Sequence, residues 1–316
     1  MTIERNLILV HTSGYQDFED FQTIARKVHE LAPDIEVFIA SNNIPSSVTR
    51  KRASNRPTLI FSPGNLLSFR PLRGKVYAGS PIPKLEELAR FRSARLPVPP
   101  SAEIVPNFEL PEAKFGSHVV VKPGFSESSR GQSITLVRRE AVCFQPRVTF
   151  PEDHPGRYGP MIAQRFIDTG PFVSHHRVLT LFGAPLLAFK TTSETARPSL
   201  DSSDEVLASI AVKARRRDGP IKREFTSDPD IIELGCRTYS ALPEIPLQGV
   251  DIIREVGSGK LYVLEANPGG NTWIFSKGDM TERLKKALGV ERLTDQFDAF
   301  TTAAKVLVER TRAEAE

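Results

Sequence analysis

The sequence predicts a mixed α/β and α+β protein, with a small parallel unit followed by lobes of antiparallel hairpins. Over roughly the first 80 residues, short apolar strands alternate with one amphipathic helix, the order that builds parallel sheets. Further along, strand-like runs follow one another in pairs across short loops containing glycine, as in hairpins. A chain of 316 residues is also long enough for two or three lobes.

The N-terminal unit is assigned to residues 1–82. Its predicted strands are Asn6–His11, Ile35–Ala40, Thr58–Phe61 and Lys75–Ala78. Between the first two strands, apolar residues recur at helical spacing on one stripe, formed by Phe18, Phe21, Ile24, Val28 and Leu31. The basic loop from Arg50 to Pro57 is expected to be solvated surface, with contact to an anionic substrate as the minor alternative.

The second unit is assigned to residues 83–160. A helix is predicted from Lys84 to Ala94, and the proline-rich run LPVPP stops it. The strand His118–Lys122 leads into a loop rich in Gly and Ser, and Ser133–Val137 is the return strand. Such a loop beside a lysine is suited to cradle phosphates, although a merely flexible hairpin loop has the same composition. The polar segment Phe150–Pro160 is expected to connect two lobes.

The third unit is assigned to residues 161–316. It begins with the strand Met161–Ile167, and a hairpin then joins Arg177–Phe182 to Pro185–Thr191. The charged segment Thr195–Phe225 is expected to be a mobile loop or a short helix with flexible flanks. Helices are predicted over Asp228–Ala241, Thr281–Leu288 and Asp295–Arg312.

The most informative stretch is a predicted hairpin formed by Val250–Glu255 and Leu261–Asn267. If Ser258 is the centre of the turn, Asp251 and Glu265 are each seven residues away and lie opposite each other. Because strand side chains alternate, Asn267 returns to the same face as Glu265. Two carboxylates and an amide therefore converge within otherwise apolar strands.

A cation between these carboxylates would relieve their repulsion. A cluster made only of oxygen ligands suits Mg²⁺, which takes its remaining ligands from water and substrate phosphates. A surface hairpin with two solvated acids is the alternative, but it would place polar neighbours around them. The apolar runs VDII and YVLEAN favour the metal site instead.

Composition narrows the functional class. No apolar run reaches the length of a membrane span and the N-terminus lacks a signal peptide, so a cytoplasmic protein is expected with no membrane partner. The two cysteines, Cys143 and Cys236, match no metal spacing and are expected to be reduced. A net charge of +4 favours anionic ligands such as nucleotides, but is too small to indicate nucleic acid.

Three motifs, taken in order, resemble the ATP-grasp superfamily. VVVKPGFSESSRGQSITLV resembles its lysine strand and phosphate loop, AQRFI its adenine hinge, and GVDII with YVLEANPGG its metal-binding end. The resemblance covers Pro83 to about Asn271. Within this range the chain is similar to D-alanine–D-alanine ligase and glutathione synthetase relatives. It implies the ATP-grasp fold, with the N-terminal unit as the domain that precedes it.

The resemblance also implies roles for individual residues. Lys84 and Lys122 would contact ATP, the segment from Ser126 to Gly131 would close over the triphosphate, and Gln164–Ile167 would hold adenine through backbone groups. Either Asp168 or a later polar residue would meet the ribose. The residues expected to bind nucleotide are Lys84, Lys122, Ser126, Ser128, Ser129, Gly131, Gln164, Arg165, Phe166, Ile167 and Asp168. Those expected to hold Mg²⁺, with Mn²⁺ as an alternative, are Asp251, Glu265 and Asn267. Those expected to act in catalysis are Arg177, Lys190 and Asn267.

The implied activity is an ATP- and Mg²⁺-dependent ligation of a carboxylate to an amine through an acyl-phosphate. Arg177 and Lys190 would meet the transferred phosphoryl group, and backbone N–H groups after Asn267 would face the acyl site. A kinase acting on a small-molecule hydroxyl and a regulatory ATP-binding protein without turnover are the alternatives. The expected partners are small carboxylate and amine substrates and no nucleic acid, with a homodimer left open. Trp273-Ile274-Phe275 would form either a substrate-pocket wall or core.

Overall fold

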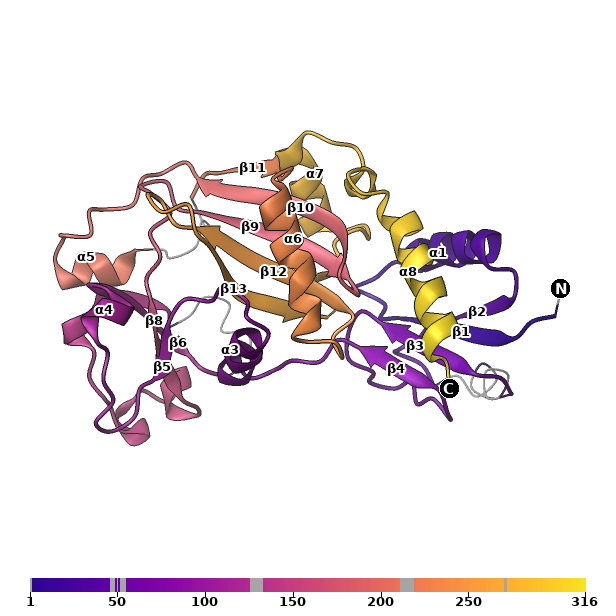
Figure 1. The fold of residues 1–316 in the computed structure, drawn as a ribbon, viewed down its shortest axis with the longest axis horizontal. Helices are drawn as coiled ribbons and strands as arrows, with labels where there is room; N and C mark the ends of the chain where they lie inside the picture. The colour runs from indigo at the N-terminus through magenta and orange to yellow at the C-terminus, as the bar shows by residue number, and fades with distance from the viewer. Residues whose placement is uncertain are drawn as a thin grey trace.

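The computed structural model describes residues 2–45, 49, 51, 55–125, 133–210, 219–269 and 272–316. Three sheets lie in a row along the longest axis of the molecule (Figure 1). A parallel sheet forms the N-terminal lobe at one end, a five-stranded sheet occupies the middle, and a smaller four-stranded sheet lies at the other end. The predicted mixed α/β and α+β class is confirmed.

The N-terminal sheet has the strand order β2-β1-β3-β4 and is parallel throughout. Its strands are β1 (Arg5–His11), β2 (Ile35–Ser41), β3 (Thr58–Ser62) and β4 (Lys75–Ala78). Helices α1 (Phe18–Leu31) and α8 (Ala299–Glu314) bury apolar faces against one side of it. A second cluster around Ile8, Ile60 and Phe69 covers the other side. Burial on both faces explains why these strands are continuous apolar runs.

The small sheet is antiparallel and has the order β5-β8-β6-β7. Its strands are β5 (Ser101–Glu103), β8 (Met161–Arg165), β6 (His118–Pro123) and β7 (Thr135–Arg138). Strand β5 and the short helix α4 (Glu112–Phe115) were not predicted, because segments this short carry too few residues to show a period.

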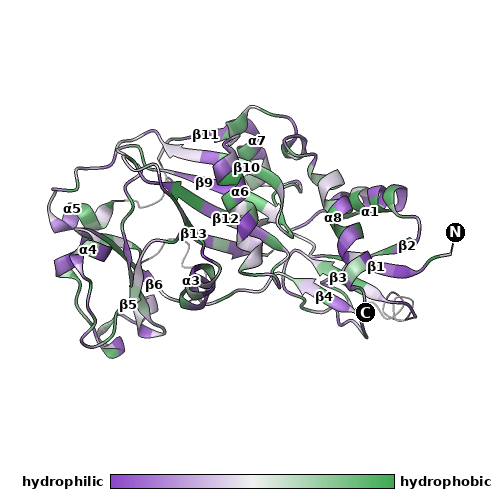
Figure 2. Ribbon diagram, in the orientation of Figure 1, coloured by the Kyte–Doolittle hydropathy of each residue, from purple (hydrophilic) through white to green (hydrophobic). Residues whose placement is uncertain are grey.

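The large sheet is antiparallel, with the order β11-β10-β9-β12-β13. Its strands are β9 (Ser174–Leu181), β10 (Ala184–Ser193), β11 (Ile221–Phe225), β12 (Leu247–Arg254) and β13 (Leu261–Pro268). The N-terminal lobe and α8 cover part of one face, and α3 (Lys84–Ser93) and α6 (Pro229–Arg237) pack on the other. Figure 2 shows hydrophobic residues concentrated in these strands and on α6.

The expectation for Thr195–Phe225 is right in one part and wrong in another. Helix α5 (Asp204–Ser209) is the short helix, and it packs against the small sheet through Leu207. Strand β11 was missed, because IKREF is mostly polar and partly exposed and takes its strand conformation from pairing with β10. Helix α7 (Asp279–Leu288) lies close to β11. Single 3₁₀ turns are present at Arg139–Ala141, Arg147–Thr149, Pro155–Arg157, Thr238–Ser240 and Leu293–Asp295.

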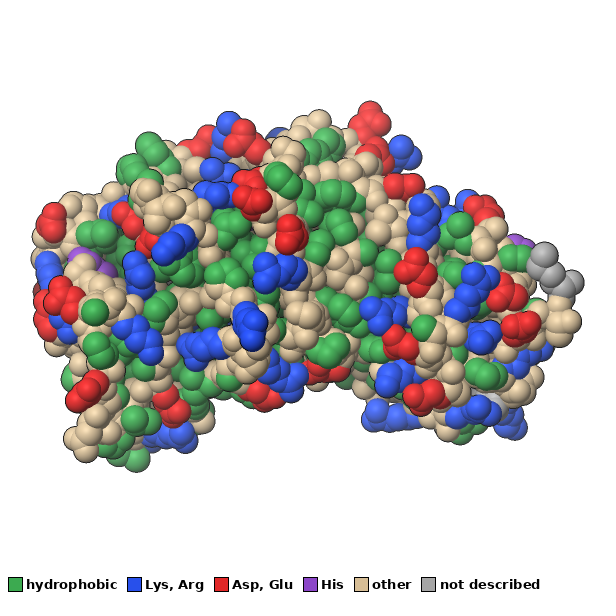
Figure 3. All heavy atoms as spheres, in the orientation of Figure 1, with side chains coloured by type: hydrophobic (Ala, Val, Ile, Leu, Met, Phe, Trp, Pro, Cys, Tyr) green, Lys and Arg blue, Asp and Glu red, His purple; other side chains and the backbone are tan. Residues whose placement is uncertain are grey.

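The end of the chain returns to its beginning. Helix α8 lies beside α1, and the backbone of Glu316 exchanges hydrogen bonds with Thr58 at the start of β3 (Figure 1). The boundaries at residues 82 and 160 stay a prediction. Strand β8 lies in the small sheet although it follows residue 160, and α8 packs against both α1 and β10. Figure 3 shows basic and acidic side chains intermingled on the face it presents, so charge is spread over that face. No helix in the described ranges is long and apolar enough to cross a membrane.

Candidate active site

The hairpin of β12 and β13 places Asp251 directly opposite Glu265, and Gly249 opposite Asn267. Near the turn, however, Arg254 pairs with Leu261, which is one residue out of phase with a turn centred on Ser258. The ladder shifts between Asp251 and Ile252, so Leu264 is an extra residue that forms a bulge. A regular ladder would have turned Glu265 to the other face. The predicted pairing is confirmed, and the bulge produces it.

Arg177 neutralises Asp251. The two residues are opposite each other on neighbouring strands β9 and β12, and Arg177 Nε lies 2.6 Å from Asp251 Oδ1. The Asp251 side chain is only 2% exposed and Arg177 is 26% exposed. Burial opposes the charged guanidinium, but Asp251, with a smaller contribution from Glu265, outweighs it and raises the pKa of Arg177.

Lys84 neutralises Glu265. It opens α3, and its ammonium group forms a short ion pair with Glu265 Oε2 at the free edge of β13. The same ammonium lies 3.6 Å from Glu87 Oε2, one helical turn further along α3. Each of the two opposed carboxylates is therefore held by its own cation in this structure.

The amide of Asn267 is fixed beside the carboxylates. Its Nδ2 donates to the carbonyl oxygen of Gly249 at 3.2 Å and to Glu265 Oε1 at 3.4 Å. Both neighbours are acceptors, which requires the NH₂ group on that side and leaves Oδ1 as the remaining acceptor. Asn267 can therefore offer an oxygen in the same region as Asp251 and Glu265.

The small sheet contributes Lys122 to this region. Lys122 donates to Gln164 Oε1 at 2.9 Å, and Gln164 Nε2 donates to Ser101 Oγ at 3.0 Å. Gln164 is buried, so this chain of bonds holds the lysine at the end of β6. Burial raises the pKa of Glu87 on α3, whereas the charge of Lys84 and, more weakly, that of Lys122 act to lower it. Lys122 of β6 and Lys84 of α3 thus act on one common neighbour.

The segment after β8 keeps part of its backbone available. The N–H groups of Arg165 and Phe166 donate to Pro100 and His118, whereas the Ile167 N–H makes no hydrogen bond among the residues that the structure describes. The Arg165 side chain pairs with Glu255 at 2.9 Å, which ties this segment to the β12–β13 turn. An available N–H at this point agrees with an adenine-binding role for the segment, which stays a prediction.

The Asp168 carboxylate forms an ion pair with Arg197. Both of its carboxylate oxygens lie 3.0 Å from Arg197 Nη2, and Oδ1 also accepts the Gly170 N–H. The Arg197 guanidinium lies 5.9 Å from the centre of the Phe166 ring. Asp168 therefore holds the loop that follows β8, and a ribose contact would have to share it with Arg197.

The prediction that Lys190 and Arg177 contribute to the same site is wrong. Lys190 is opposite His176 in the ladder, whereas Arg177 is opposite Phe189. Because side chains alternate along a strand, Lys190 points to the face of Ala188, which α6 covers, and Arg177 points to the other face. The expected phosphate-loop residues Ser126, Ser128, Ser129 and Gly131 lie outside the described residues.

The metal-motif loop meets the carboxyl edge of the N-terminal sheet. Gly79, after β4, lies so close to this loop that a Cβ on it would be 2.5 Å from the Cα of Gly269 and 2.3 Å from the carbonyl oxygen of Pro63. Trp273 is buried and donates to Asp20 of α1 at 2.9 Å, and Ser276 donates to the same carboxylate at 2.6 Å. Of the two alternatives for Trp273-Ile274-Phe275, the core is the one observed.

One charged residue of this region was not among the sequence predictions. Glu87 is 3% exposed, and its Oε1 accepts the Ala266 N–H at 2.7 Å, between Glu265 and Asn267. The sequence did hold a signal for it, because Glu87 is four residues before the buried Phe91 and therefore lies on the inner stripe of α3.

Comparisons with known proteins agree with this architecture. The ATP-grasp ligase PsnB, complexed with a minimal precursor, is 15% identical, with 98% of this chain and 100% of that chain covered and a TM-score of 0.51. The D-cycloserine synthetase DcsG is 12% identical, with 96% and 99% covered and a TM-score of 0.52. No protein-family model and no curated protein matches the sequence. The chain therefore has the ATP-grasp fold, as the three motifs predicted.

Proposed function

We propose that this protein is an ATP- and Mg²⁺-dependent ligase that joins a carboxylate to an amine through an acyl-phosphate. The observation that carries the proposal is the opposed pair Asp251 and Glu265, each paired with a cationic side chain, Arg177 of β9 and Lys84 of α3. The two structural neighbours described above have names that describe a ligase and a synthetase, which supports the same class of reaction for this chain.

The oxygen donors at the hairpin fit Mg²⁺. Asp251, Glu265 and the amide oxygen of Asn267 would hold it, since Mg²⁺ prefers oxygen ligands and binds through one or two carboxylates. The described part of the chain contains no group of three or more His, Cys, Asp or Glu side chains suited to a metal. A site with two carboxylates needs further oxygens, which the phosphates of ATP would supply. Mn²⁺ would accept the same donors.

Lys84, Lys122 and Arg177 are suited to a phosphoryl-transfer reaction, in which negative charge develops on phosphate oxygens. A substrate carboxylate oxygen attacks the γ-phosphorus of ATP and ADP leaves; an amine then attacks the acyl carbon, loses a proton, and phosphate leaves. Lys84 and Lys122 would neutralise the phosphates, and Arg177 would face the developing charge. Mg²⁺ held by Asp251, Glu265 and Asn267 would add positive charge where negative charge develops on the phosphates. No side-chain nucleophile is needed.

A labelling experiment tests this function. Pools of amino acids and small carboxylates labelled with ¹⁸O in the carboxylate are incubated with ATP, Mg²⁺ and the protein, and ADP and phosphate are analysed. The proposal predicts ADP release that depends on a carboxylate and an amine, with one ¹⁸O atom in the released phosphate. Glu265→Ala should abolish it, whereas Glu282→Ala, on the exposed face of α7, should not.

The two other classes of activity give different results. A kinase would release ADP with hydroxyl acceptors and would leave no ¹⁸O in free phosphate. A regulatory protein would bind ATP and release no ADP with any pool. Either result would overturn the ligase proposal.

A further inference from the structure

Glu87 is an unusual carboxylate for the inner face of a helix. Its side chain is 4% exposed, and it lies at the edge of the large sheet, between α3 and β13. A buried ionised carboxylate is costly unless hydrogen bonds and a cation compensate it. One oxygen is compensated by the Ala266 N–H, whereas Oε2 makes no hydrogen bond among the described residues.

The nearest cation to Glu87 Oε2 is Lys84, at 3.6 Å. That ammonium is shared, because it also forms the short ion pair with Glu265. Lys84 therefore lies between two carboxylates, one of which is expected to bind Mg²⁺. A metal ion at Glu265 would repel the ammonium, and Glu87 is then the anion that remains beside it.

We infer that Glu87 is a positioning residue: it retains the Lys84 ammonium at the site when Glu265 turns from Lys84 to Mg²⁺. The inference rests on the proposed function, and it adds a role that the metal ligands do not supply. Without the charge of Glu87, the Lys84 ammonium is held more firmly by Glu265, so Mg²⁺ must compete with it more strongly. Burial raises the pKa of Glu87, and the Lys84 ammonium 3.6 Å away opposes this by favouring the ionised form. When Glu87 is ionised, the exchange leaves Lys84 paired and close to the phosphates.

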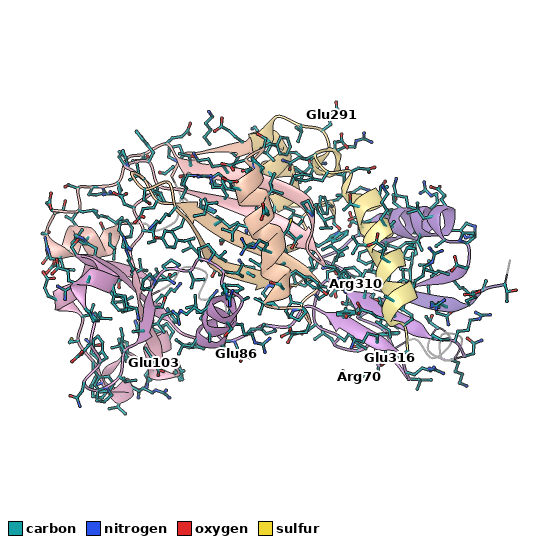
Figure 4. All side chains as sticks on the ribbon, viewed as in Figure 1. Arg70, Glu86, Glu103, Glu291, Arg310 and Glu316 are labelled. Atoms are coloured by element: carbon teal, nitrogen blue, oxygen red, sulfur yellow. The ribbon has the colours of Figure 1, made fainter. Side chains whose placement is uncertain are left out.

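The substitution Glu87→Gln separates this role from a structural one. Glutamine keeps an oxygen that can accept the Ala266 N–H, so the edge of β13 stays capped, but it removes the charge. Glu86→Gln is the matched control, because Glu86 precedes Glu87 on α3 and pairs with Arg90 away from the site. Figure 4 shows Glu86 at the outer side of α3.

The measurement is the Mg²⁺ concentration that gives half-maximal binding of the ATP analogue AMPPNP, by calorimetry. Glu87→Gln is expected to raise this concentration about fivefold, an effect of the size seen for charged residues in direct contact. Glu86→Gln should leave it unchanged. In a Lys84→Gln background, Glu87→Gln should change it less than about twofold, because Glu87 acts through Lys84. Equal values for Glu87→Gln and Glu86→Gln, or an undiminished effect without Lys84, would overturn the inference.

Two further variants keep the test decisive. If Glu87→Gln does not fold, Lys84→Gln carries the test with the metal alone, because Lys84 is also expected to contact the phosphates. Without nucleotide, Mn²⁺ should bind Lys84→Gln more tightly than the wild type, and weaker binding would contradict the inference. Glu265→Gln distinguishes the two levels of the argument. If it binds Mg²⁺ and AMPPNP as the wild type does, the proposed metal site fails and the role of Glu87 fails with it. If Glu265→Gln weakens Mg²⁺-dependent AMPPNP binding and Glu87→Gln does not, the metal site stands and only the role of Glu87 is refuted.

Discussion

Asp251 is almost completely buried, so its charge must be balanced inside the protein. Arg177 does this in the present structure, and the geometry is tight, with 2.6 Å between Nε and Oδ1. Removing one partner of a buried ion pair leaves an uncompensated charge, which costs far more than the loss of an exposed pair. The same charge that makes Asp251 costly to bury makes it a strong ligand for a cation.

Arg177→Met is therefore expected to lower the free energy of unfolding by about 3 kcal/mol without metal. Mg²⁺ with AMPPNP should recover part of this loss, because a second cation then compensates Asp251. Urea unfolding with and without these ligands measures both effects. Arg254→Met is the control, since Arg254 pairs with Asp228 at the same 2.6 Å but both side chains are more than a third exposed. Arg254→Met should lower the free energy of unfolding by less than about 1 kcal/mol. Equal losses for the two variants would show that Arg177 does not compensate a buried charge.

His176 lies on the opposite face of β9 from Arg177. Burial, followed by the positive charge of Lys190, lowers its pKa to about 4. Its ring nitrogen Nδ1 lies 2.9 Å from Thr226 Oγ1. Lys190, which the sequence assigned to catalysis, thus acts on a neutral histidine beneath α6.

This histidine should make the protein less stable in acid. Its folded pKa lies below its ordinary value of 6.5, so the folded state binds fewer protons between the two values. The stability it contributes is complete above pH 6.5 and is lost as the pH falls toward 4. Between pH 7 and 4.5 the wild type should lose about 2 kcal/mol more unfolding free energy than His176→Gln. Parallel pH profiles for the two proteins would exclude a buried neutral His176.

At the scale of single elements, the β12–β13 hairpin shows what a sequence can specify. The alternation of VDII and YVLEAN was enough to predict that Asp251, Glu265 and Asn267 share one face. The bulge at Leu264 was not predictable, because the ladder shift depends on the geometry of the turn and of the neighbouring strand. The prediction for Lys190 failed for a related reason. The face to which Lys190 points depends on how β9 and β10 pair, and its place at the end of a predicted strand does not reveal that register.

The turn between β9 and β10 gives a test at this scale. Phe182 and Gly183 both have positive φ, at 49° and 83°, the conformation of the two-residue turns that suit the strand twist. A Cβ on Gly183 would also lie 3.3 Å from the carbonyl oxygen of Cys236 and from Tyr239 Cβ. Gly183→Ala should therefore cost about 1 kcal/mol in a denaturant titration. A variant as stable as the wild type would mean that the turn is not held in this conformation.

At the scale of the whole molecule, the large sheet, the small sheet and α3 bring together residues that are far apart in the sequence. Lys84, Arg177 and Glu265 come from α3, β9 and β13, and Lys122 acts from the small sheet. The order of the motifs was sufficient to predict the fold, because each motif fixes one element of it. The return of α8 to the N-terminal sheet and the burial of Glu87 were not predictable, since they depend on contacts between distant segments.

The central claim is that the hairpin carboxylates hold a divalent cation together with a nucleotide. Electron paramagnetic resonance of Mn²⁺, titrated with ADP into the wild type, Glu265→Gln and the exposed control Glu282→Gln, tests it most directly. We predict nucleotide-dependent Mn²⁺ binding that Glu265→Gln weakens at least about tenfold and Glu282→Gln leaves unchanged. Equally tight Mn²⁺ binding by Glu265→Gln and the wild type would contradict the account.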